Sequence, residues 1–88
     1  MKKLWMDRAW KDYLRMQERE RDMLRKVNQL IRDTERSPFT GKGKPEPLKG
    51  SLSGYWSRRI TDEHRLVYRV QGDILEIYSC RSHYNWDF

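Results

Sequence analysis

The segment from Gly54 to Val70 has the pattern of two β-strands joined by the polar turn Thr61-Asp62-Glu63. It is rich in aromatic and β-branched residues, which favour strands. In the second strand, His64, Leu66, Tyr68 and Val70 share one face, and Arg65, Val67 and Arg69 share the other. The hairpin carries four arginines, Arg58, Arg59, Arg65 and Arg69. We interpret it as having an apolar face that packs on a core and a basic face that either attracts an anion or is simply solvated.

Two amphipathic helices are predicted before this hairpin. Asp7 is a favourable N-cap for the first, and aromatic and apolar residues recur at helical spacing from Trp10 to Gln17. A polar break at Glu18 to Asp22 precedes the second helix. Its apolar positions are Leu24, Val27, Leu30 and Ile31. Ser37-Pro38 ends it, because the residue before proline avoids the helical region.

Two further strands complete the predicted fold. Lys3 to Met6 is a short apolar run, and Ile74 to Arg81 follows the turn Gln71-Gly72-Asp73. These elements predict an α+β fold with two N-terminal helices on one face of a small, antiparallel-rich sheet. The 88 residues, 1–88, are expected to form a single domain.

Between the helices and the hairpin, Pro38 to Ser53 is interrupted by prolines and glycines and is predicted to be a loop. Long loops in small domains are often functional. Glu46 lies between Pro45 and Pro47, whose fixed φ angles restrict how its carboxylate is presented. Three lysines surround it: Lys42, Lys44 and Lys49. The segment lacks the terminal Lys-Ser/Thr of a phosphate-binding P-loop.

The charge balance indicates the kind of partner. Nineteen basic and thirteen acidic residues give a net charge of +6, which favours nucleic acid or another polyanion. Cys80 is the single cysteine and lies in an apolar strand pattern, so we expect a buried thiol and a reducing compartment. No long apolar run follows Lys2 and Lys3, so we expect no signal peptide or membrane span and a cytoplasmic location.

Few residue types are available for catalysis. The two histidines, His64 and His83, and Cys80 are too few for a zinc site, and no serine or cysteine nucleophile motif is present. Glu46, Arg65 and His83 remain. RNA cleavage by its own 2′-hydroxyl needs a base, a cation for the phosphorane and an acid for the leaving oxygen, which these three types supply without metal. From composition alone, a solvated Glu46 and a surface His83 are the more ordinary interpretation.

Longer motifs resemble one family. They are Pro38–Lys49 (PFTGKGKPEPLK), Leu52–Ile60 (LSGYWSRRI), Glu63–Tyr68 (EHRLVY) and Cys80–Tyr84 (CRSHY), together with Trp10 and Tyr13. In this order, over nearly the whole chain, they resemble the Txe/YoeB family of bacterial toxins.

The resemblance implies a RelE-like, microbial-ribonuclease-like fold and a toxin that enters the ribosomal A site and cuts messenger RNA. It implies that Glu46 is the general base, His83 the general acid and Arg65 the stabiliser of phosphate charge. Lys49, Arg59 and Tyr84 would contact RNA. It further implies a cognate antitoxin (YefM/Axe-like), the ribosome as a partner, no cofactor and a possible homodimer.

Two other functions fit the composition. A basic α+β domain can bind RNA or the ribosome without cutting, and a helical hairpin can bind a protein. Asn85-Trp86-Asp87-Phe88 extends beyond the family's pattern next to the expected site. Strict alternation would put His83 on the face of Leu75 and Ile77, so we expect those residues to be covered or the last strand to contain a bulge.

Overall fold

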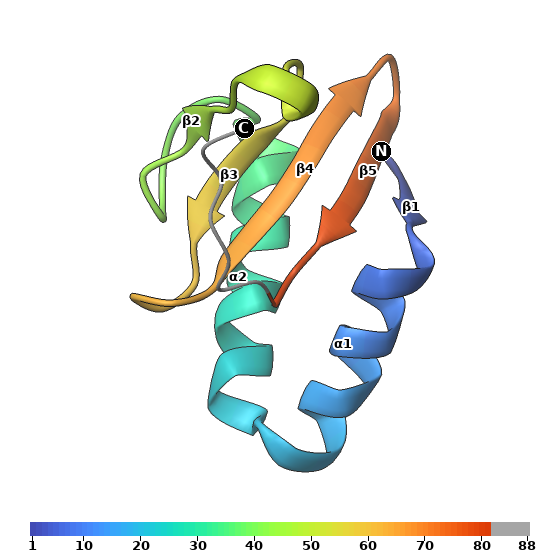
Figure 1. Cartoon of the computed structure of the whole chain (residues 1–88), viewed down its shortest axis with the longest axis vertical. Coiled ribbons are helices and arrows are strands. Elements are labelled where there is room, and N and C mark those ends of the chain that lie inside the picture. The colour runs from blue at the N-terminus through green and yellow to red at the C-terminus, as the bar shows by residue number, and fades with distance from the viewer. Residues whose placement is uncertain (82–88) are drawn as a thin grey trace.

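The computed structural model describes residues 1–81, in which two helices pack against a five-stranded sheet (Figure 1). In chain order the elements are β1 (Lys2–Trp5), α1 (Asp7–Arg19), α2 (Arg21–Arg36), β2 (Glu46–Pro47), β3 (Trp56–Arg59), β4 (Arg65–Gln71) and β5 (Ile74–Ser79). A short 3₁₀ turn spans Gly50–Leu52. The predicted α+β fold, with both helices preceding the hairpin, is confirmed.

The sheet has the strand order β1-β5-β4-β3-β2. β1 runs parallel to β5, and the other three pairings are antiparallel. The strand predicted at Lys3 to Met6 therefore exists as β1, at one edge. The opposite edge is β2, which the proline- and glycine-rich pattern did not predict because it has only two residues.

The helix boundaries differ from the prediction at the start of α1 and at the break between the helices, which was predicted to span Glu18 to Asp22. Met6, in an extended conformation, is the N-cap of α1, and Asp7 is the first helical residue. The predicted capping role of Asp7 is therefore wrong, although an acidic residue in the first turn still interacts favourably with the helix dipole. The break between the helices is the single residue Glu20, and α2 ends before Ser37-Pro38 as predicted.

The core lies between the helices and one face of the sheet. Its buried residues are Ala9, Met16, Val27, Leu30, Ile31, Ile60, Leu66, Tyr68, Leu75, Ile77 and Cys80. Cys80 is buried as predicted, and its thiol donates to the carbonyl oxygen of Ala9 over 3.4 Å. Burial raises the pKa of this thiol to about 12, so it is not a thiolate nucleophile near neutral pH.

A bulge interrupts the pairing of β4 with β5. Tyr68 is opposite Ile77, whereas the preceding residue, Val67, is opposite Ser79, so Tyr78 is the extra residue. Ile77 faces the helices, and Ser79 therefore lies on the other face of the sheet. The expected bulge is confirmed, while His83 lies outside the described residues.

Candidate functional site

The sheet face turned away from the helices, which we call the open face, carries the candidate site. One row of opposed residues crosses four strands on this face: Glu46 of β2, Ser57 of β3, Val67 of β4 and Ser79 of β5. These residues share a face because directly paired residues point to the same side of a sheet. Val67 was predicted to lie on the outward basic face. It does lie on this face, but its side chain is fully buried.

Glu46 and Arg65 lie side by side at one end of this face. Arg65 Nη1 is 3.6 Å from Glu46 Oε1, and the side chains keep 24% and 60% of their accessible surface. The pairing of β3 with both β2 and β4 brings these two residues together although they are nineteen positions apart. A carboxylate and a guanidinium are thus held next to each other where a bound molecule can reach both.

The structure describes two other predicted site residues. Arg59 is directly opposite Arg65 in the β3–β4 pairing and is exposed, so both guanidinium groups start from the open face. Lys49 is exposed and immediately precedes the 3₁₀ turn that follows β2. The predicted site residues His83 and Tyr84 lie outside the described residues 1–81.

Arg58 has a different role from the one its position in the basic hairpin predicted. It lies opposite Leu66, on the helix side of the sheet, and its side chain is completely buried. Its guanidinium forms a 2.7 Å salt bridge with Asp33 of α2. It also donates to three loop carbonyl oxygens, those of Ser37 (2.6 Å), Thr40 (2.9 Å) and Lys42 (3.0 Å). Arg58 is therefore a structural residue and not part of an anion-attracting face.

These contacts fix the loop that leads into β2 and Glu46. Tyr68 reinforces them, because its hydroxyl accepts from Arg58 Nε and donates to the Pro38 carbonyl oxygen over 2.6 Å. Burial raises the pKa of Tyr68, which keeps this hydroxyl a donor. The loop thus reaches Glu46 from a fixed starting point in the core.

Asp33 is the acid that compensates Arg58. Its Oδ2 accepts from the backbone N–H of Lys42 over 2.8 Å as well as from Arg58. The Lys42 hydrogen bond, followed by that from Arg58, lowers the pKa of Asp33 below its ordinary value. Asp33 therefore stays ionised at neutral pH and ties the loop to α2.

Gly43 allows the loop to pass close to β3. Its φ is +80°, a conformation that residues with a Cβ rarely adopt, and its carbonyl oxygen accepts from the Arg59 N–H over 2.7 Å. A Cβ at this position would lie 2.9 Å from Leu30 Cδ2 and 3.1 Å from the Arg59 carbonyl oxygen. Only glycine fits here without displacing the core or the strand.

The charge of Arg69 is also balanced by contacts within the protein. Its guanidinium binds Glu76 Oε1 at 3.0 Å and lies 4.9 Å from the centre of the Tyr55 ring. Tyr55 donates to the other Glu76 oxygen over 2.7 Å. The prediction grouped Arg69 with the anion-attracting arginines, but its charge is balanced by Glu76, the residue directly opposite it on β5.

Sequence reasoning did not identify two hydroxyl groups on the open face. Ser57 and Ser79 are fully buried, and within residues 1–81 their Oγ atoms have no hydrogen-bond partner. The alternating pattern of side chains around the charged residues of the hairpin gave no reason to select these two serines as site residues. Their position in the row that begins with Glu46 follows only from the register of four strands.

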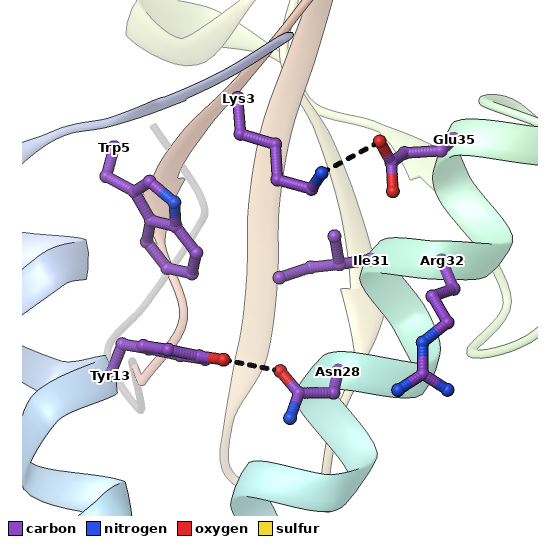
Figure 2. Close-up of a pocket in the computed structure, with 7 residues that line it drawn as sticks. All are labelled: Lys3, Trp5, Tyr13, Asn28, Ile31, Arg32 and Glu35. Carbon is purple, nitrogen blue, oxygen red and sulfur yellow. Dashed lines mark hydrogen bonds and ion pairs between the residues drawn. The ribbon is translucent and has the colours of Figure 1, made fainter. Parts of the chain in front are cut away.

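A pocket of about 320 Å³ lies on the opposite side of the sheet, between β1 and the two helices (Figure 2). Its polar side chains mainly bind one another: Lys3 pairs with Glu35 at 3.0 Å, and Tyr13 donates to Asn28 over 2.7 Å. The pocket contains none of the predicted catalytic residues. Residues 1–81 contain no cluster of His, Cys, Asp and Glu suited to a metal ion, and no helix among them is long and apolar enough to span a membrane.

Comparison with known proteins identifies the family to which these features belong. The model of the YoeB-like toxins of bacterial type II toxin-antitoxin systems matches residues 5–84. The Escherichia coli (strain K12) protein Toxin YoeB is 60% identical over 84 residues, which is 96% of this chain and all of that protein.

Solved structures agree with the sequence matches. A YoeB/ParE toxin from Agrobacterium tumefaciens has a TM-score of 0.92 and 55% identity, covering 96% of this chain and all of that one. YoeB from Staphylococcus aureus, solved in a heterotetrameric complex with YefM and also as a dimer, has a TM-score of 0.89 and 41% identity, covering 96% and 98% of the two chains. The fold and these matches place the chain in the family of YoeB-like toxins of bacterial type II toxin-antitoxin systems.

Proposed function

We propose that this toxin is a ribosome-dependent endoribonuclease that cuts messenger RNA in the ribosomal A site. The observation that supports the proposal is the pair formed by Glu46 and Arg65, whose Oε1 and Nη1 atoms are 3.6 Å apart on the open face. An enzyme that activates a 2′-hydroxyl next to a phosphate needs a base and a cation within one nucleotide's reach. A protein that only binds RNA has no use for a carboxylate among its cations, because it repels phosphate.

In the proposed reaction, Glu46 removes the proton of the 2′-hydroxyl, and the 2′-oxygen attacks the adjacent phosphorus. Arg65 stabilises the negative charge of the phosphorane. His83 protonates the departing 5′-oxygen as the P–O5′ bond breaks. The products are a 2′,3′-cyclic phosphate and a 5′-hydroxyl, so neither water nor a metal ion is needed for the cleavage step.

Three further residues are proposed to hold the RNA. Lys49 and Arg59 would neutralise phosphates beside the reacting one, since both are exposed, Arg59 directly opposite Arg65 and Lys49 three positions after Glu46 in the sequence. Tyr84 would stack on or orient a base. The chemistry assigned to these residues calls for no cofactor.

The proposed dependence on the ribosome has a physical reason. One general base or acid contributes about 10²–10⁴-fold to a rate, and the open position of Glu46 gives the RNA few surfaces that would fix it for in-line attack. Orientation by a second body can supply the rest of the acceleration. The ribosome, which holds the A-site codon in a defined path, is the proposed second body.

The remaining partners follow from the family. We propose a cognate antitoxin of the YefM/Axe type and a homodimer, as the Staphylococcus aureus relative was solved with YefM and as a dimer. We propose that residues 1–88 act as one toxin domain and work in the cytoplasm, where translating ribosomes are found.

The test uses ribosomes programmed with a defined message, to which purified wild-type protein or Glu46→Gln is added. Cut positions and the chemistry of the new ends are mapped. We expect cuts within the A-site codon that leave a cyclic or 3′-phosphate and a 5′-hydroxyl. Glu46→Gln should lose cleavage while still binding ribosomes, because the amide cannot take a proton but has nearly the same shape.

Glu18→Gln is the matched control, since Glu18 is an exposed acid on α1, away from the open face. It should cut at the wild-type rate. Unchanged cleavage by Glu46→Gln would remove the assigned base. Wild-type binding without any cutting would instead identify a non-catalytic RNA- or ribosome-binding module.

A further inference from the structure

A second basic site lies on the helix side of the molecule. Gln29, Arg32 and Arg36 follow one another at i, i+3 and i+7 on α2 and so share one face of that helix. Lys42, from the loop before β2, faces them across a pocket of about 130 Å³. All four residues are exposed. Figure 1 shows α2 behind the sheet, on the side opposite the open face.

The pocket carries an uncompensated positive charge. Its single acid, Asp33, is already bound by Arg58 and by the backbone N–H of Lys42. Within residues 1–81 the side chains of Arg32, Arg36 and Lys42 form no salt bridge. In Figure 2, where Arg32 is drawn, the other charged side chains are paired and the Arg32 guanidinium is not. These three cations therefore line a pocket whose single acid is already paired.

We propose that Arg32, Arg36 and Lys42 bind a phosphate of ribosomal RNA and so form an anchoring site separate from the cleavage site. The proposal rests on the proposed function, because it takes the ribosome as the particle that this toxin binds. Since the pocket lies on the far side of the sheet from Glu46, the RNA it contacts is not the message being cut.

The lining of the pocket favours a phosphate over a peptide. Its five residues, Gln29, Arg32, Asp33, Arg36 and Lys42, include no aromatic or aliphatic side chain. Protein interfaces depend on buried aromatic and apolar anchors, which this pocket lacks. Two guanidinium groups and an ammonium group are, by contrast, the usual ligands of phosphate oxygens.

The position of Lys42 is fixed by the fold. Its N–H donates to Asp33 over 2.8 Å, and its carbonyl oxygen accepts from Arg58 over 3.0 Å. Its side chain thus starts from a defined point, so a phosphate held by α2 also contacts the loop that leads to Glu46. The same buried Arg58 therefore supports both the cleavage site and the proposed anchoring site.

The test measures binding to ribosomes as a function of salt. All proteins carry Glu46→Gln, so that the result does not depend on cleavage, and vacant and programmed ribosomes are compared. The test variant adds Arg32→Gln, Arg36→Gln and Lys42→Gln. The matched control instead adds Lys11→Gln, Arg15→Gln and Arg19→Gln. These substitutions remove the same amount of charge from three exposed basic residues of α1.

Each phosphate contact contributes about 0.7–0.9 to the slope of log K against log salt. Because the site holds one phosphate, we expect the test variant to lower the magnitude of that slope by about 1 and to weaken binding at 0.1 M salt by up to about 10-fold, on vacant ribosomes as well as programmed ones. The lysine counterparts, Arg32→Lys with Arg36→Lys, should recover most of the slope, because they keep the charge.

Three results would overturn the proposal. They are an unchanged slope in the test variant, an equal loss in the α1 control, and a loss on programmed ribosomes alone, which would assign the contact to the message. Lys42→Gln alone, a loop substitution on an exposed side chain, tests the site if the triple variant does not fold. A smaller fall in the slope, below about 1, is then expected, and no change overturns the proposal.

A final experiment tests whether the site also binds a free phosphate ion. Inorganic phosphate is titrated into the protein while backbone amide resonances of residues 29–42 are followed by NMR. Saturable shifts that the triple variant lacks support a phosphate site, and their absence at millimolar phosphate together with an unchanged ribosome slope would refute it. If the wild-type protein, with Glu46 intact, binds ribosomes through these residues yet cuts no message, the proposed cleavage fails and the anchoring site stands.

Discussion

Replacing Arg58 with methionine tests the most connected residue of the fold. Methionine has a similar length and no charge. The change removes a fully buried guanidinium that binds the Asp33 carboxylate and donates to the carbonyl oxygens of Ser37, Thr40 and Lys42. These acceptors, which lie in partly buried hydrogen bonds, are then left without their donor.

The expected loss of stability follows from these contacts. Removing one partner of a buried ion pair costs about 3–5 kcal/mol, because the remaining polar groups lose their compensation. A domain of this size has a free energy of unfolding of about 5–15 kcal/mol, so the substitution removes at least about a fifth of it. For a chain of 60–100 residues each kcal/mol shifts the melting temperature by about 4–8 °C, which predicts a fall of at least about 12 °C.

Equilibrium unfolding in urea, followed by tryptophan fluorescence, measures this loss. Arg59→Met is the matched control, since it removes an exposed arginine from the neighbouring position of β3 and should change stability by less than about 0.5 kcal/mol. A loss below about 1 kcal/mol for Arg58→Met would refute the conclusion that this residue holds the loop to the core.

Two further predictions concern the same loop. Because the pKa of Asp33 is lower in the folded protein, its contribution to stability is complete well above the ordinary value of 3.8 and is lost as the pH falls through that value towards the folded pKa. Asp33→Asn should therefore flatten the acid limb of a stability–pH curve, and an unaltered limb would contradict this. Gly43→Ala should destabilise by more than the ~1–3 kcal/mol of backbone strain, because its Cβ meets Leu30 and the Arg59 carbonyl oxygen. Gly54→Ala, at φ +96° with open space around it, should show the strain alone, and equal losses in thermal melts would contradict the steric argument.

The helices and long strands could be predicted from the sequence because their apolar residues recur with a clear period. Leu24, Val27, Leu30 and Ile31 mark α2, and the alternation at Leu66 and Tyr68 marks the core face of β4. β2 was missed because two residues between prolines and glycines show no period at all. Its pairing is specified by β3, which lies ten residues further along the chain.

The arginines of the hairpin show why a functional site is harder to predict from sequence than a helix or a strand. Arg58 and Arg59 are adjacent and chemically identical, yet one is buried against α2 and the other is exposed on the open face. Which arginine faces inward depends on the register of β3 against β4. Residue types made Glu46 and Arg65 candidates and the family resemblance gave them roles, whereas their 3.6 Å separation depends on three strands pairing correctly.

The parallel pairing of β1 with β5 also affects how the protein is made. Lys2 is opposite Ile74, so the first strand to leave a translating ribosome has no neighbour until almost the whole polypeptide has been synthesised. A nascent chain that stops before residue 74 lacks β5, and with it the surface on which β1 and α1 pack. Contacts this far apart in sequence also slow folding. A toxin built in this way is assembled at the end of its own translation, and premature termination yields an incomplete sheet.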